Sequence, residues 1–243
     1  MKPAPSIAAL VLSLFGLSSF ASIADADELE PFVATYQVFH EGRELGDATM
    51  QLAQLEGPRW RIDLGMKGRG LMRMTGLNVQ QSTLFDHQGA TLRPLTQSTV
   101  KRAFLSSRKS VGVYDWNTRS ARWTGDVKKT RTAAIALQDG DMSGLLIDLA
   151  VIRDAEPGRT MHYRFVDDGR AREHTWVVSP QTEGVSVGEL SYEAMRVERV
   201  EDGGDQTILW VAKGVPTPIR ILQREDGHDA TDLRLVEYKG ASQ

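Results

Sequence analysis

The segment Arg59–Leu64 reads RWRIDL, so that charged and apolar side chains alternate residue by residue. Successive side chains of a β-strand point to opposite faces, and a strand with one wet and one dry face requires this alternation. The same period of two recurs in residues 47–52, 161–165, 208–212 and 219–221. Such strands are typical of an antiparallel sheet that packs one face and exposes the other to solvent.

Turn-forming residues separate these strands. Glycine, aspartate and proline gather at residues 56–58, 86–89, 167–169, 201–204 and 226–228. These residue types suit tight connections, because glycine and aspartate tolerate a positive φ. Asp168-Gly169 lies between two alternating segments and predicts a hairpin over residues 161–178. Many short strands at near-regular spacing predict a meandering sheet or an open barrel.

One segment departs from the strand pattern. Residues 143–155 carry apolar side chains at helical spacing, and Asp141 or Ser143 provides a possible cap at the start. Pro157-Gly158 then ends the helix. We therefore expect a mainly β protein, built as an antiparallel, strongly curved sheet or incomplete β-barrel with one central α-helix.

The composition limits the class of protein. The chain has 243 residues, is 41% hydrophobic and 25% charged, and has a net charge of −3 and no cysteine. This is typical of a globular protein, not of a disordered chain or a disulfide scaffold. Near-balanced charge argues against a nucleic-acid partner, because surfaces that bind a phosphate backbone are usually strongly basic. Lack of cysteine excludes thiol catalysis, zinc–thiolate sites and iron–sulfur clusters.

The N-terminus has the pattern of a secretory signal peptide. Lys2 precedes an apolar run from Ile7 to Phe20, and small residues flank Asp25 just before an acidic stretch. Residues 1–26 are therefore expected to be removed after Ala26, with Ala21 as a second possible site. We expect residues 27–243 to form a single β-rich domain in the periplasm, with neither a lipid anchor nor a transmembrane anchor after cleavage.

The spacing of reactive side chains indicates neither a metal site, a cofactor nor a catalytic group. No two histidines stand at the i, i+2 or i, i+4 spacing of paired ligands; they are His40, His87, His162, His174 and His228. His162 and His174 are placed so that they could pair across the expected hairpin. The sequence Gly140–Gly144 superficially resembles an esterase elbow, but its glycine spacing is wrong and favours Ser143 as a helix cap.

The tryptophans lie in strand-like segments, as Trp60, Trp116, Trp123, Trp176 and Trp210. An aromatic side chain on a strand either buries its large area in the core or forms a platform that stacks on a sugar ring. We expect these residues mainly in the core.

A glycine-punctuated segment, Gly65–Gly76, combines methionines with cations and lacks a clear period. Its candidate ligand-binding residues are Met66, Lys67, Arg69, Met72, Arg73 and Met74. Flexible methionines beside basic groups suit an apolar mouth that receives an amphiphile with an anionic head group. The alternative is a loop whose methionines fold back over the sheet. A second basic stretch, Lys101–Lys109, either extends the same rim or forms a solvated hairpin end.

Several stretches resemble a known family. They are Tyr36–Gly46, Asp141–Leu146, Glu193–Val197, Trp210–Gly214 and Pro216–Ile221. Together they are similar to the bacterial envelope family catalogued as domain of unknown function 3108. The resemblance implies an exported, mostly β protein and supplies neither an agreed activity nor catalytic residues. A remoter likeness, of architecture only, is to periplasmic lipoprotein carriers whose curved sheet surrounds a helix and an apolar cavity.

Three functions remain open from the sequence. The first is non-catalytic binding of an amphiphilic or lipid ligand, and it predicts an apolar cavity beside Gly65–Gly76. The second is a protein-interaction or assembly factor for envelope or polysaccharide biogenesis, which would use an exposed sheet edge to bind an envelope protein. The third is a hydrolase, which needs polar residues that converge in a pocket.

Overall fold

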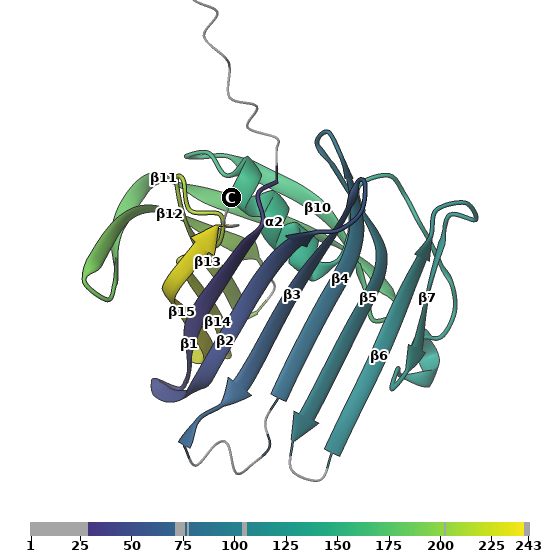
Figure 1. Ribbon diagram of the computed structural model, residues 1–243, viewed down its shortest axis with the longest axis horizontal. Helices are drawn as coiled ribbons and strands as arrows, with labels where there is room; N and C mark the ends of the chain where they lie inside the picture. Colours follow the sequence, from purple (N-terminus) through teal and green to yellow (C-terminus); the bar gives the residue numbers. More distant parts are fainter. Residues whose placement is uncertain (1–28, 71–75, 77, 104–105, 202, 241–243) are drawn as a thin grey trace, which may run out of the picture.

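The computed structural model describes residues 29–70, 76, 78–103, 106–201 and 203–240. These residues form one large sheet and one α-helix (Figure 1). The first strands are β1 (Phe32–His40), β2 (Arg43–Gln54), β3 (Arg59–Gly68), β4 (Asn78–Gln88), β5 (Thr91–Ala103), β6 (Ser106–Asp115), β7 (Ser120–Gly125), β8 (Ile135–Ala136) and β9 (Asp141–Met142). The later strands are β10 (Thr160–Asp167), β11 (Arg170–Val187), β12 (Leu190–Val200), β13 (Gln206–Ala212), β14 (Arg220–Glu225) and β15 (His228–Gly240). The helix α2 spans Gly144–Asp154, and a short 3-10 helix, η1, spans Lys129–Arg131.

Within the described residues all 15 strands belong to one sheet, in the order β8-β7-β6-β5-β4-β3-β2-β1-β15-β14-β13-β12-β11-β10-β9. Neighbouring strands are antiparallel except for β9 and β10, which are parallel. The pairing register shifts at five places, and such bulges bend a strand and increase its twist. The expected fold class is thus confirmed: a strongly curved, mainly antiparallel sheet that does not close into a barrel.

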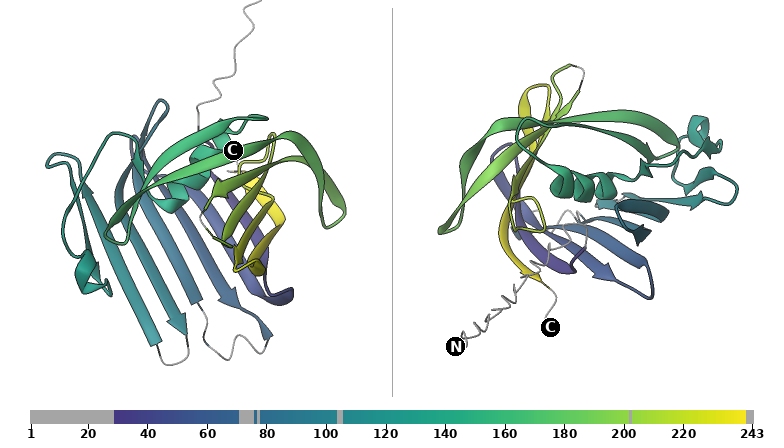
Figure 2. Two further views of the ribbon diagram at one scale, coloured as in Figure 1. Left: turned by 180° about the vertical axis from the view of Figure 1, so that it is seen from behind. Right: turned by 90° about the horizontal axis from the view of Figure 1, so that it is seen from above.

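The sheet stays open between its two ends. Contacts made by side chains join these ends, in place of backbone hydrogen bonds between strands. The hydroxyl group of Tyr114, on β6, donates a hydrogen bond of 2.6 Å to the carbonyl oxygen of Val166, on β10. Arg131, in η1, forms an ion pair with Asp168 in the turn between β10 and β11. These contacts hold β10 beside the β6–β7 end of the sheet, and the two views in Figure 2 show the resulting curve.

The helix lies inside the curve of the sheet, as the view from above in Figure 2 shows. Leu146, Ile147 and Val151 of α2 are almost completely buried. They belong to the same apolar cluster as the inward-facing residues of most strands, including Tyr36 and Ile62. The alternation of each strand therefore turns its apolar residues toward a core that α2 fills at the centre.

Several local expectations are confirmed and others need correction. The turn at Asp168-Gly169 does join two strands, and helix α2 begins directly after Ser143. However, the Ser143 side chain makes no capping hydrogen bond; its Oγ lies 2.9 Å from Oγ1 of Thr83. Ser143 is completely buried, and its hydroxyl group forms its hydrogen bond with Thr83 of β4 and not with the start of the helix.

His162 and His174 do not pair across the hairpin, because His174 lies opposite Tyr163 and His162 lies opposite Thr175. The two histidines therefore project from opposite faces of the sheet. Among the tryptophans, Trp116 is also misplaced by the sequence pattern: it is half-buried in the turn after β6, whereas the other four are buried on strands.

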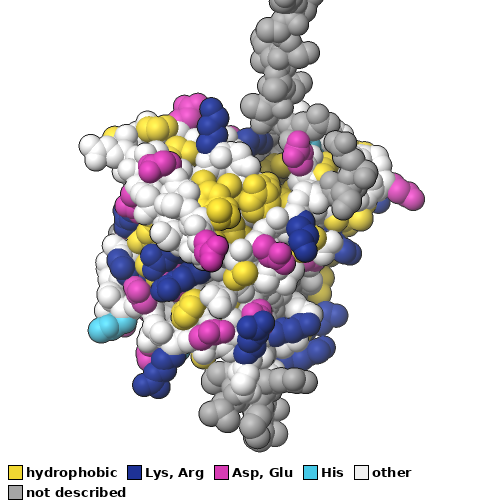
Figure 3. Space-filling model, turned by 60° about the vertical axis from the view of Figure 1, so that its left-hand side comes forward, with side chains coloured by type: hydrophobic (Ala, Val, Ile, Leu, Met, Phe, Trp, Pro, Cys, Tyr) yellow, Lys and Arg dark blue, Asp and Glu magenta, His cyan; other side chains and the backbone are white. Residues whose placement is uncertain are grey.

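The surface is of mixed character. The face drawn in Figure 3 carries a group of hydrophobic side chains with both acidic and basic side chains around it. The expected signal peptide, residues 1–26, lies outside the described residues. Within the part of the chain that the structure describes, no helix is long and apolar enough to span a membrane.

Candidate functional site

A cavity of about 450 Å³ lies between α2 and the inner face of the sheet. We call it the central cavity. Part of its wall is apolar, formed by Leu64, Met66, Val79, Leu145, Ile147 and Phe165. This volume falls within the usual range for small-molecule sites, which are concave, largely apolar and contain a few well-placed polar groups.

The part of the wall formed by β11–β15 carries a row of polar side chains that crosses these five adjacent strands. Each residue of this row pairs with the next across the sheet, and all of them line the cavity: Trp176, Arg199, Thr207, Gln223 and Thr231. Paired residues in adjacent strands lie on the same face, so the five side chains point inward together.

Two residues further along each strand, the same face becomes apolar. The second row consists of Val178, Val197, Leu209, Ile221 and Leu233, which are also paired in succession and are all buried. Ile221 and Leu233 line the cavity as well. The cavity wall therefore changes from polar to apolar along β14 and β15, whereas Val178, Val197 and Leu209 belong to the packed core.

Arg199 is the electrostatic centre of the polar row. It forms an ion pair with Glu201, which also accepts a hydrogen bond of 3.1 Å from the hydroxyl group of Thr207. The Arg199 charge also acts on Asp148, in the middle of α2, and on His174 of β11. Asp148 and His174 both line the cavity, so Arg199 connects the helix wall with the sheet wall.

Burial shifts the pKa values of Asp148 and His174. It raises the pKa of the Asp148 carboxyl group to about 7, although the positive charge of Arg199 opposes the rise. Burial lowers the pKa of His174 to about 4, and Arg199 acts in the same direction while Glu201 opposes it. His174 is stacked on Phe165, with ring centroids 4.6 Å apart. At neutral pH, His174 is therefore uncharged and Asp148 is close to its titration midpoint.

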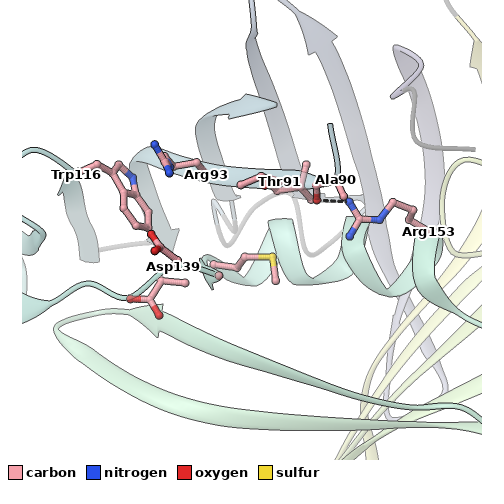
Figure 4. Close-up of a pocket in the computed structure, with 10 residues that line it drawn as sticks. Ala90, Thr91, Arg93, Trp116, Asp139 and Arg153 are labelled. Carbon is pink, nitrogen blue, oxygen red and sulfur yellow. Dashed lines mark hydrogen bonds between the residues drawn. The ribbon is translucent and has the colours of Figure 1, made fainter. Parts of the chain in front are cut away.

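A second, smaller cleft of about 320 Å³ lies beside the start of β5 and the end of α2 (Figure 4). Its polar groups bond to the protein itself. The guanidinium group of Arg153 donates a hydrogen bond of 2.8 Å to the Ala90 carbonyl oxygen, and the Trp116 indole donates one of 2.7 Å to Pro94. Arg93 covers the ring of Trp116 at 4.9 Å. Because these groups have partners, we take the central cavity as the candidate site.

The structure separates the residues that the sequence grouped together. Met66 lines the central cavity, whereas Lys67, the next residue of β3, is exposed on the other face. Arg69 forms ion pairs with Asp47 and, at 3.9 Å, with Glu44. Met72, Arg73 and Met74 lie outside the described residues. Of the second basic stretch, Lys101 lines the cavity.

Sequence reasoning missed the polar residues of the cavity, although each carries a detectable signal. Asp148 is an acidic residue in the middle of an apolar helix. His174 and Arg199 each lie two residues from a buried residue of the same strand, Trp176 and Val197 respectively. A polar residue in phase with the apolar face of a strand must point inward. The sequence could therefore have identified Asp148 from its place in an apolar helix, and His174 and Arg199 from their alternation with buried residues.

Solved structures with a similar fold include one from a bacterium. It is a beta-barrel-like protein of domain of unknown function DUF1849 from Brucella abortus, with a TM-score of 0.58 and 13% sequence identity. The match covers 89% of this chain and 100% of that one. At this identity the likeness concerns the fold alone. The chain matches no curated protein.

A family model fits most of the sequence. It is described as a protein of unknown function (DUF3108) and matches residues 32–233. This span begins at the first residue of β1 and ends within β15, so it includes α2 and every strand that lines the central cavity. The chain therefore belongs to the DUF3108 family.

Proposed function

We propose that this protein is an exported, non-catalytic binding protein whose central cavity holds one amphiphilic molecule in the periplasm. The observation that carries the proposal is the divided lining of the cavity, in which the polar row on β11–β15 borders apolar side chains of α2, β3 and β14–β15. An amphiphile has the same division into a polar head and an apolar chain. Burying its chain against the apolar side chains that line the cavity favours binding by removing apolar surface from water.

The position of Met66 supports this proposal. Met66 lines the cavity from β3, and methionine adapts its shape to flexible apolar ligands. The proposed ligand site thus retains one residue of the segment that the sequence singled out. The basic residues Lys67 and Arg69 are not part of this site.

The other candidate functions have less support. A strand-addition factor needs long unpaired edges. β8 and β9 pair with only two residues each of β7 and β10, but β10 faces the β6–β7 end of the sheet, where the Tyr114 hydroxyl group binds the Val166 carbonyl oxygen. A hydrolase built on Ser143 needs an accessible nucleophile, but Ser143 is completely buried and its hydroxyl group contacts Thr83. The geometry favours ligand binding in the cavity over both.

Binding can be tested with N-phenyl-1-naphthylamine, an apolar probe whose fluorescence rises when it leaves water. We expect saturable binding of one probe molecule to the wild type. Met66→Trp fills part of the cavity and is expected to weaken binding by about tenfold or more, since it removes the space the probe occupies. The probe is excited at a wavelength that tryptophan does not absorb.

Lys67→Trp is the matched control, because it adds the same side chain to the exposed face of the same strand. It is expected to bind the probe as the wild type does. Circular dichroism melts confirm that both variants are folded. Non-saturable fluorescence with the wild type, or equal binding by the two variants, would contradict the proposal.

A further inference from the structure

One hydrogen-bond donor in the central cavity has no acceptor. The side chain of Trp176 is 2% exposed, and its Nε1 is buried without a hydrogen-bond partner among the described residues. Other tryptophans do have acceptors: Trp116 donates to Pro94 and Trp210 donates to Glu183. Burying an N–H group without an acceptor costs free energy, so Trp176 is an exception that calls for a ligand.

An acceptor without a donor lies in the same cavity. Asp148 lines the cavity from α2, and no described residue donates a hydrogen bond to its carboxylate. The charge that acts on it is that of Arg199, the direct cross-strand neighbour of Trp176. Paired residues on adjacent strands have Cβ atoms roughly 5 Å apart. Because Arg199 neighbours Trp176 and acts on Asp148, the unpaired Trp176 Nε1 and the Asp148 carboxylate lie in one region of the cavity.

The donor and the acceptor set different requirements for a charged head group. A carboxylate can accept from Trp176 but cannot donate to Asp148, and it would lie beside a like charge when Asp148 is ionised. An ammonium group can donate to Asp148 but has no lone pair with which to accept from Trp176. Arg199 is paired with Glu201, and Lys101, which also lines the cavity, is exposed on β5.

A hydroxyl group meets the remaining requirement, since it donates one hydrogen bond and accepts another. We propose that the central cavity selects amphiphiles with an uncharged, hydroxyl-bearing head group that donates to Asp148 and accepts from Trp176 Nε1. This rests on the proposed function, and it replaces the anionic head group expected from the sequence. The chemical class includes monoacylglycerols and long-chain alcohols.

The test compares three ligands that share a ten-carbon chain: monodecanoylglycerol, decanoate and decylammonium. Isothermal titration calorimetry at pH 7.5, below the micelle concentration of each ligand, gives the three dissociation constants. We expect monodecanoylglycerol to bind at least about tenfold more tightly than either charged ligand, the ratio that a pair of buried hydrogen bonds typically provides.

Two variants remove the two proposed hydrogen bonds separately. Trp176→Phe keeps most of the buried aromatic area but removes the N–H group, and Asp148→Leu removes the carboxylate. Each is expected to weaken monodecanoylglycerol binding by about fivefold to twentyfold. Trp210→Phe is the matched control, because its N–H group bonds to Glu183 outside the central cavity. It is expected to leave the affinity unchanged.

The outcomes separate the two proposals. Equal affinities for the three ligands, tighter binding of either charged ligand, or unchanged affinity in both cavity variants would overturn the head-group inference while leaving amphiphile binding in place. If none of the three ligands binds, the proposed function itself fails, and the inference fails with it.

Discussion

The ionisation of Asp148 makes the stability of the fold depend on pH. Its pKa is about 7 in the folded protein, against an ordinary value of 3.8. Between these values the folded state retains a proton that the unfolded state has released, so folding stability falls as pH rises from about 4 to about 7. Asp148→Asn removes this loss. We expect the variant to gain roughly 2–4 kcal/mol over the wild type at pH 8 and little at pH 4.

The measurement is urea unfolding of both proteins across this pH range. His174 has the opposite effect, because its lowered pKa makes the folded state lose stability as pH falls from about 6.5 to about 4. Both proteins contain His174, so its contribution drops out of the difference in unfolding free energy between variant and wild type. Glu189→Gln, at an exposed carboxylate in the turn after β11, is the control. A difference between Asp148→Asn and wild type that does not change with pH would refute the assignment.

Tyr36 ties the first strand to the loop before β14. Its buried hydroxyl group contacts Thr217 and donates a hydrogen bond of 2.9 Å to the Pro218 carbonyl oxygen. Tyr36→Phe leaves that oxygen without its donor and is expected to lower the free energy of unfolding by about 1–3 kcal/mol. Tyr238→Phe, at a side chain that is 37% exposed, should change it by less than about 0.5 kcal/mol. Equal effects in chemical denaturation would mean that the buried hydroxyl group is not stabilising.

At the scale of elements, the turn between β10 and β11 is closely packed against η1. Gly169 has a φ of +69°, and an added Cβ would lie 2.1 Å from the carbonyl oxygen of Arg131. Gly42 has a similar φ of +75° but open space around it. Gly42→Ala should cost about 1 kcal/mol of backbone strain, and Gly169→Ala at least twice as much because the backbone of η1 must also move.

Urea unfolding of the two glycine variants measures both losses. Both variants pay the cost of a positive φ. The additional loss of stability in Gly169→Ala therefore measures the close contact between η1 and the β10–β11 turn. If the two variants lose the same stability, η1 does not pack against this turn as described.

The elements themselves could be predicted from the sequence because their signals are local. Alternation in Arg59–Leu64 needs only neighbouring residues, and so does the apolar spacing of α2. Errors arose where the outcome depended on distant contacts. Ser143 was expected to cap α2, but Thr83, 60 residues away, binds its hydroxyl group. Trp116 looked like a strand residue because local pattern does not show where a strand ends.

For the whole molecule, the curve of the sheet depends on pairing that no local pattern contains. β1 pairs with β15, and β10 meets β6 through the hydrogen bond from Tyr114 to Val166. The candidate site was predictable only in part for the same reason. Met66 could be identified from its segment, but Arg199 and Trp176 become neighbours only through the register of β11 and β12.

If the curved sheet holds one amphiphile in its central cavity, the ligand should remain bound in the gas phase. Native mass spectrometry of the protein after incubation with a lipid extract of its own host measures this. We expect a single one-to-one adduct that Lys67→Trp retains and Met66→Trp loses. A bare protein mass, or an adduct that Met66→Trp keeps undiminished, would contradict it.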